Sequence, residues 1–457
     1  MRLTLYILIL LEIVCRYYLL GKNSNSRLQT LLLSGLIQSL MIYPILFSNL
    51  IELKKRGLEY LGAPFETNIA ILFPTIIALI MILWGGHVRK WNFKDVKFPV
   101  IALSLVFLYS YITPLNHSLD ATSIALLLFL QVLFVVVVCK TFLSEKQVMC
   151  ALYDAFTIIV LVEFFVCFSY VVLHVDTLQG FFKVDIDETE WIREGTSVRR
   201  AYGTTIQPNR LGGLASYLLV FFVSCTLFNY KRTLSLVMIL LDLIVVIFSQ
   251  SRSALMASII SSVLLYLLIS TKRGKLKFQK LMVSLLLFAI LLIGLFSLGI
   301  VGDMVFKSDV GDMREARGSH YILGWLILQK SNFMGVGLNS HVLYMYEELN
   351  IGSFADFLLT RAIHSVHLTI FVETGIVGFI AWLYYLVSRV YKTIKIRLNE
   401  MNIPILWFTF TGMLFIVIVH GFTDYLYLHY QYIMILSLCG SFISTKTFSL
   451  VKHKYLF

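Results

Sequence analysis

Apolar runs of membrane length recur along the whole chain and constrain its fold more than any other feature. A helix crosses a bilayer with about 20 apolar residues. Thirteen runs are candidates for such helices: 3–20, 28–50, 67–84, 98–113, 121–139, 150–175, 211–229, 234–250, 253–270, 281–301, 366–387, 403–420 and 430–445. The first run carries two charged residues, Glu12 and Arg16. Whether this run crosses the membrane decides between 12 and 13 transmembrane helices. The pattern predicts an all-α polytopic membrane protein with 12 or 13 transmembrane helices.

The composition excludes the other broad classes of protein. Of the 457 residues, 58% are hydrophobic and 14% are charged, against roughly 25% charged residues in soluble domains. So few charges exclude a soluble globular, disordered or fibrous chain. The net charge of +12 indicates loops that contact anionic lipid, and we predict no nucleic-acid partner. The six cysteines lie in or beside apolar runs without a CxxC motif, which predicts no disulfide framework.

The distribution of lysine and arginine predicts the orientation of the chain in the membrane. Basic residues gather in loops that are therefore predicted to be cytoplasmic, at 22–27, 89–97, 140–146, 231–232, 272–280, 389–397 and 446–454. Loops 114–120 and 421–429 contain no Lys or Arg, which predicts that they lie outside. The C-terminus is then inside. Thirteen spans would put the N-terminus outside, and twelve would put it inside.

Two predicted outer loops are long, at 176–210 and 302–365. Long loops in compact proteins often carry function. The second contains an apolar stretch at 319–328 that is too short to span, so we expect a helix there that lies on the outer face. The chain divides into an N-terminal transmembrane bundle (1–175), a central region with both loops (176–400) and C-terminal transmembrane helices (401–457).

Arginines near the predicted outer membrane edge are candidate anion ligands. Arg252 lies between two apolar runs with almost no loop, so it either snorkels to the surface or faces a cavity. Arginine matches phosphate oxygens in a two-pronged fork. The long outer loops add further arginines, among them Arg200, Arg314 and Arg317. A lipid-linked diphosphate at the outer leaflet needs several such donors.

Histidines and buried carboxylates offer other chemistry. His364 and His367 are three residues apart, but no third zinc ligand accompanies them, so we predict no metal site. A histidine beside a substrate is suited to general base catalysis, and an interfacial structural histidine is the alternative. Glu163 and Asp242 fall within spans, where carboxylates mark a proton path or, as we favour here, pair with neighbours. Gly335-Val-Gly337 is explained by a sharp turn.

Four segments together resemble the O-antigen ligase and Wzy-type polysaccharide polymerase family. They are Arg200-Ala-Tyr-Gly-Thr-Thr-Ile-Gln-Pro-Asn209, Ser251-Arg-Ser-Ala254, Trp325 with Asn332-Phe-Met-Gly-Val-Gly-Leu338, and His364-Ser-Val-His-Leu368 with Glu373-Thr-Gly-Ile-Val-Gly378. The last is the most specific, and the likeness covers roughly residues 195–390. This chain departs from the family at Ser365, where Asn is usual, at His367, where an aromatic is common, and at Tyr321, where the family has an arginine.

The resemblance implies a GT-C-type glycosyltransferase in the bacterial cytoplasmic membrane, with its active site facing outward and with no cofactor or metal. The donor would be a glycan linked to undecaprenyl diphosphate. His364 would be the catalytic base, and the diphosphate ligands would be Arg200, Arg252, Arg314 and Arg317. The supporting residues would be Arg210, His367 and Glu373. Besides membrane lipid, the expected partners are a flippase and a chain-length regulator.

We expect a polymerase that joins lipid-linked repeat units into surface polysaccharide. A ligase that moves finished glycan to another acceptor is the alternative within the family. A lipid-linked oligosaccharide flippase or other transporter is the alternative from another class. A transporter is expected to show two similar halves, whereas the charges here cluster in two unequal outer loops.

Overall fold

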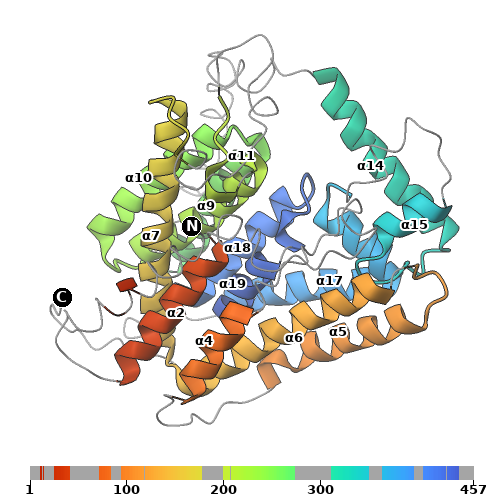
Figure 1. The fold of residues 1–457 in the computed structure, drawn as a ribbon, viewed down its shortest axis with the longest axis horizontal. Coiled ribbons are helices and arrows are strands. Elements are labelled where there is room, and N and C mark those ends of the chain that lie inside the picture. Colours follow the sequence, from red (N-terminus) through yellow and green to blue (C-terminus); the bar gives the residue numbers. More distant parts are fainter. Residues whose placement is uncertain are drawn as a thin grey trace.

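Figure 1 shows the fold of the protein in a computed structural model. It describes residues 11–12, 14, 25–41, 72–83, 94–117, 119–177, 199–205, 207–272, 310–348, 363–395, 405–428 and 430–441. The regular elements in these ranges are helices: α2 (Asn25–Met41), α4 (Leu72–Leu83), α5 (Lys94–Ile112), α6 (Leu119–Phe142), α7 (Glu145–Val171), η3 (Gly203–Thr205), α9 (Pro208–Leu227), α10 (Arg232–Ser249), α11 (Arg252–Lys272), α14 (Val310–Lys330), α15 (His341–Glu348), α17 (Val366–Lys395), α18 (Ile405–His420), η5 (Leu426–Leu428) and α19 (Tyr430–Ser441).

Six of these helices are long and apolar enough to cross a membrane. They cover Leu119–Phe142, Glu145–Val171, Pro208–Leu227, Arg232–Ser249, Arg252–Ser270 and Val366–Ile394. Shorter apolar helices cover Val100–Ile112, Ile405–His420 and Gln431–Ser441. The all-α polytopic membrane fold is therefore confirmed. The predicted runs at 3–20 and 281–301 lie almost wholly or wholly outside the described residues, so the total of 12 or 13 spans stays a prediction.

The helix boundaries follow local sequence signals. Ser144 caps α7: its side chain accepts a hydrogen bond from the backbone N–H of Gln147, and the Gln147 side chain accepts one from the Ser144 N–H. Pro208 opens α9 at a position where its missing N–H costs nothing. Gln250 ends α10 in the left-handed conformation, which lets the chain reverse into α11 within two residues.

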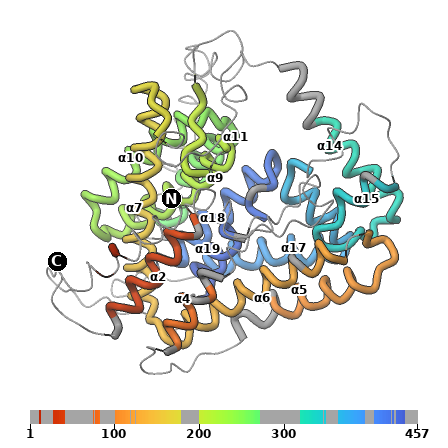
Figure 2. The backbone as a smooth tube through the Cα atoms, viewed as in Figure 1, coloured from red at the N-terminus to blue at the C-terminus, as the bar shows by residue number. Residues whose placement is uncertain are grey.

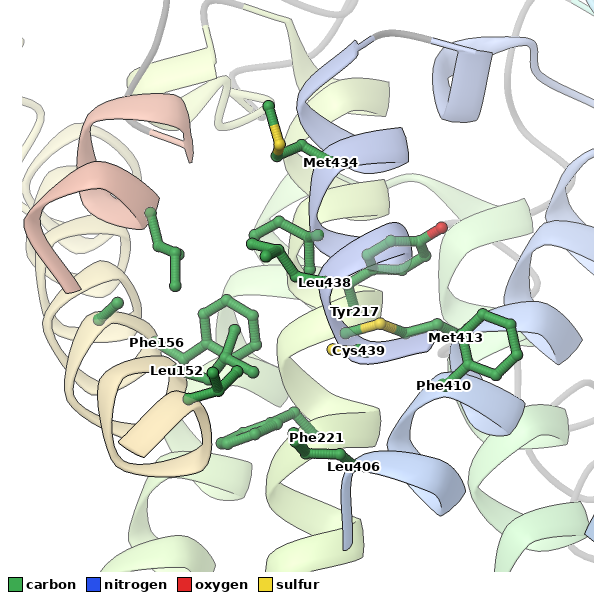
Figure 3. Packing of buried hydrophobic residues seen from close by; sticks show 14 of the residues in the cluster. Leu152, Phe156, Tyr217, Phe221, Leu406, Phe410, Met413, Met434, Leu438 and Cys439 are labelled. Carbon is green, nitrogen blue, oxygen red and sulfur yellow. The ribbon is translucent and has the colours of Figure 1, made fainter. Parts of the chain in front are cut away.

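The main hydrophobic core lies where α7, α9, α18 and α19 meet. Figure 3 shows Leu152 and Phe156 of α7 near Phe221 of α9, with side chains of α18 and α19 beside them. Buried serines join α9 to α11, because the Ser258 hydroxyl donates to the Ser216 hydroxyl at 2.8 Å. Close helix approach through small residues is common in membrane bundles. The core therefore holds α9 and α11 against α18.

A second, smaller core joins α14, α15 and α17 away from the main bundle (Figures 1 and 2). It is built from Leu323, Ile327 and Leu328 of α14 with Val342 of α15 and Val372 of α17. The helix predicted at 319–328 is present as part of α14, which begins earlier at Val310. The backbone of α14 carries Arg314 and Arg317, whose side chains lie outside the described residues.

Candidate functional site

His364 lies directly before α17, where three elements meet. Its ring contacts that of His320 on α14 edge-on, with centroids 5.1 Å apart, and that of Tyr425, with centroids 5.6 Å apart. His364 is half-buried and His320 is buried. The backbone N–H of Val366 donates to the Gly421 carbonyl at 2.8 Å. We call His320, His364 and Tyr425 the histidine cluster.

A break inside α17 brings the two most family-like motifs together. Gly375 has φ 65° and ψ −170°, a conformation that is essentially restricted to glycine. The freed carbonyls of Val372 and Glu373 accept hydrogen bonds from the N–H groups of Val336 and Gly337, at 3.0 and 2.9 Å. A side chain at Gly335 would come within 2.8 Å of the Glu373 carbonyl. The sharp turn predicted at Gly335–Gly337 is present, with φ of +89° and +96° at the two glycines.

Glu373 also binds a histidine that sequence reasoning did not select. His341 Nδ1 and Glu373 Oε1 are 2.6 Å apart, and both side chains are buried. His341 Nε2 accepts a hydrogen bond from the backbone N–H of Ile363 at 3.4 Å. The two residues are 32 positions apart, and no local pattern predicts their contact. His320 and Tyr425 were missed for the same reason.

The contacts of His367 indicate a structural role. Its Nε2 donates to the Ile418 carbonyl at 3.1 Å, and its Nδ1 accepts from the Trp382 indole N–H at 3.2 Å. Its ring also packs against Phe422, with centroids 4.6 Å apart. Because both ring nitrogens are used, His367 is suited to holding α17 against α18 and not to exchanging a proton with substrate.

Three of the predicted arginines lie around the turn between α10 and α11. The Arg200 guanidinium donates to the Ser249 carbonyl at 3.5 Å and to Asn209 Oδ1 at 3.4 Å. Arg252 is the first residue of α11 and is half-buried. Arg210 lies in the first turn of α9. We call Arg200, Arg210 and Arg252 the arginine turn.

Close backbone packing holds the arginine turn. The N–H of Ala201 donates to the Phe248 carbonyl at 2.9 Å. A side chain at Gly212 would lie 2.8 Å from the Cβ atoms of Ser251 and Ala254, so α9 and α11 nearly touch there. The chain before α9 and the turn after α10 are thus fixed against each other.

The segment between α18 and α19 contacts both the histidine cluster and α9. Its Tyr425 belongs to the histidine cluster, and its Tyr427 stacks on Tyr217 of α9, with ring centroids 5.2 Å apart. The Tyr432 hydroxyl donates to the Arg210 carbonyl at 2.9 Å. Burial raises the pKa of the Tyr427 hydroxyl well above its usual value, and this hydroxyl is hydrogen-bonded to His420 Nδ1 at 2.7 Å. The histidine cluster and the start of α9, which carries Arg210, are therefore linked through this segment and α19.

The two carboxylates within spans have different surroundings. Glu163 pairs, as we favoured, because its carboxylate accepts from the backbone N–H of Thr204 at 2.9 Å and from the Thr204 hydroxyl. Asp242 is buried, and among the described residues neither of its carboxylate oxygens has a hydrogen-bond partner. Within the same part of the chain, no three His, Cys, Asp or Glu side chains are grouped as metal ligands would be.

The described helices define a multi-pass all-α membrane protein with polar groups gathered at helix ends. A family model described as O-antigen ligase matches residues 234–383, from the start of α10 into α17. The resemblance predicted from the sequence is therefore confirmed, and it supports a role in processing glycans at a membrane. The matched range contains Arg252, His364 and Glu373, whereas Arg200 and Arg210 precede it. No curated protein matches the chain.

Proposed function

We propose that this protein is a metal-independent glycosyltransferase that joins undecaprenyl-diphosphate-linked oligosaccharide repeat units into a surface polysaccharide. The product would be an O-antigen, a capsule or an exopolysaccharide, made at the outer face of the bacterial cytoplasmic membrane. The observation that carries the proposal is the position of His364. It opens the most family-like segment, lies within the matched range and is half-buried at the junction of α14, α17 and the segment before α19.

The reaction needs a group that accepts a proton. The acceptor hydroxyl oxygen forms a bond to the anomeric carbon of the donor, and the bond from that carbon to the diphosphate oxygen breaks. The hydroxyl proton passes to His364, and a single displacement of this kind inverts the anomeric carbon. General base catalysis of this type contributes typically 10²- to 10⁴-fold.

The departing lipid diphosphate gains negative charge, which the arginine turn is suited to stabilise. Donors that are fixed before the reaction stabilise developing charge without reorganising. Arg200 is held by Ser249 and Asn209, and Arg252 begins a helix whose start is packed against α9. We propose Arg200 and Arg252 as diphosphate ligands, with Arg210 in support. Arg314 and Arg317 on α14 are proposed ligands on their sequence positions alone.

A polymerase and a ligase differ in the acceptor, and the description of the matched family keeps the ligase as the second candidate. Purified protein incubated with lipid-linked repeat unit alone distinguishes them. A polymerase converts the unit into a ladder of longer lipid-linked chains. A ligase leaves it unchanged until a second acceptor is added. No glycan transfer under either condition, with folded protein and intact donor, would contradict both, and would leave a transporter as the remaining reading.

The outward orientation is tested separately. Single cysteines are introduced into a Cys-less variant and labelled from outside with an impermeant thiol reagent. We expect labelling in loop 302–365 and none in 271–280, because the second segment is rich in lysine. The reverse pattern would contradict an outward-facing site. A flippase that supplies the lipid-linked unit and a chain-length regulator are the proposed partners.

A further inference from the structure

The buried pair of His341 and Glu373 has a defined protonation pattern. A backbone N–H can only donate, so His341 Nε2, which receives the N–H of Ile363, must carry a lone pair. The ring proton of the neutral imidazole is then on Nδ1, where it is donated to Glu373 Oε1 at 2.6 Å. Glu373 therefore fixes the tautomer of His341, and the tautomer leaves Nε2 free to hold the backbone at Ile363.

The held backbone directly precedes His364. Ile363 is anchored at both of its polar groups, because its carbonyl accepts from the Thr369 hydroxyl at 3.2 Å and from the Ser365 N–H at 2.7 Å. On the other side of His364, the Ser365 hydroxyl donates to the Gly421 carbonyl at 3.1 Å. The position of His364 thus depends on fixed neighbours on both sides, and His341 supplies the N-terminal one.

Glu373 joins this arrangement to the break in α17. Its carboxylate binds His341, and its backbone carbonyl accepts the N–H of Gly337 four residues earlier in the chain than His341. The turn at Gly335–Gly337 and the start of α15 are therefore both tied to one residue. Burying a carboxylate costs free energy unless it is hydrogen-bonded. The bond of Glu373 to His341 meets this need and also orients the His341 ring.

We infer that His341 and Glu373 are positioning residues for glycan transfer, in which Glu373 orients His341 and His341 holds Ile363 so that His364 faces the acceptor hydroxyl. This inference rests on the proposed function. Neither residue exchanges a proton with substrate. The effect of both on the reaction passes through His364.

Two amide substitutions of His341 separate its two bonds. In His341→Asn, the side-chain NH₂ occupies the place of Nδ1 and keeps the bond to Glu373, but nothing reaches Ile363. In His341→Gln, the longer side chain places an acceptor oxygen near the position of Nε2. Misplacing a reacting group by about 1 Å can cost about 10²-fold. We expect kcat to fall about 10²-fold in His341→Asn and less than about 10-fold in His341→Gln, with KM for the donor within about threefold in both.

Glu373 is tested with a matched pair. Glu373→Gln keeps an oxygen that accepts the Nδ1 proton, and we expect it to retain kcat within about 10-fold of wild type. Glu373→Leu removes the acceptor, and we expect a fall of about 10²-fold. The control is Tyr153→Phe, which removes a buried hydrogen bond to Ser235 in the main core. We expect it to lower the melting temperature and leave kcat unchanged.

Three outcomes would overturn the inference. The first is equal loss of kcat in His341→Asn and His341→Gln. The second is equal loss in Glu373→Gln and Glu373→Leu, which would make the negative charge itself the functional feature. The third is a fall in kcat that simply follows the melting temperature across all variants, including the Tyr153 control.

A double-mutant cycle separates this inference from the proposed function. If His341 acts through His364, adding His341→Asn to His364→Ala should lower kcat no further. If His364→Ala is slow and His341→Asn lowers its kcat by the same factor as it lowers that of wild type, the positioning role alone is overturned. A His364→Ala variant with wild-type turnover would overturn the proposed base, and the positioning role with it.

Discussion

The arginine turn and the histidine cluster are held in place by different means. At the arginine turn, helices approach closely through small residues, with Gly212 against Ser251 and Ala254. Around the histidine cluster, α17 is broken at Gly375 and its free carbonyls bind the turn at Gly335–Gly337. The arginine turn is held because regular helices pack tightly. The surroundings of the histidine cluster depend on backbone conformations that only glycine adopts readily and on buried side-chain hydrogen bonds.

This difference suits the two proposed tasks. A diphosphate ligand needs charge at a fixed height on the membrane edge, which a packed helix end provides. A catalytic base needs one exact orientation of a ring, which several directional hydrogen bonds provide. We therefore expect substitutions at the arginine turn to affect donor binding and charge stabilisation, and those around the histidine cluster to affect the transfer step.

The largest effect at the arginine turn is expected for Arg252. Removing one preorganised donor to a developing charge typically costs 10²- to 10³-fold. Arg252→Ala should lose activity by about that factor, and Arg252→Lys should restore little of it, because an ammonium group lacks the two-pronged geometry. The loss of activity is measured as polymer length on a gel, and the amount of membrane-inserted protein is measured in parallel. Normal polymer from Arg252→Ala at normal protein level would make Arg252 a charge that only sets topology.

A smaller effect, on stability, is expected for Gly375→Ala. The backbone conformation of Gly375 costs about 1–3 kcal/mol for a residue with a side chain, and the new Cβ would also collide with the Met334 carbonyl. The free energy of unfolding should fall by about 3 kcal/mol, with transfer lost even where protein remains folded. Thermal unfolding in detergent measures the change. A fully stable and active Gly375→Ala variant would show that the break in α17 is unnecessary.

The smallest effect is expected for Gly212→Ala at the arginine turn. An added methyl group in a tight contact costs about 1–3 kcal/mol, and alanine regains about 1 kcal/mol through its better helix propensity. The net loss in the free energy of unfolding should therefore be about 0–2 kcal/mol, below that of Gly375→Ala. If Gly212→Ala lowers the free energy of unfolding more than Gly375→Ala does, the close helix packing at the arginine turn matters more for stability than the break in α17. The comparison between the two regions is then reversed.

The sequence predicted the features that have a local cause. Apolar length predicted the spanning helices, and the two glycines predicted the turn at Gly335–Gly337. The break at Gly375 was not predicted, because an isolated glycine within an apolar run reads as ordinary helix. The contact of His341 with Glu373 was not predicted either, since it depends on how two distant segments pack. The roles of Arg200, Arg252 and His364 in the reaction stay predictions.

The most direct test of the proposed transfer site is a single-turnover assay of His364→Gln. Purified protein is given lipid-linked repeat unit, and donor binding and glycan transfer are followed separately. Glutamine keeps similar size and hydrogen bonding but takes up no proton at neutral pH, so donor should bind as in wild type while transfer slows by roughly 10²- to 10⁴-fold. Transfer at the wild-type rate would contradict the role of His364 as base and would leave catalysis to the arginines and to substrate positioning.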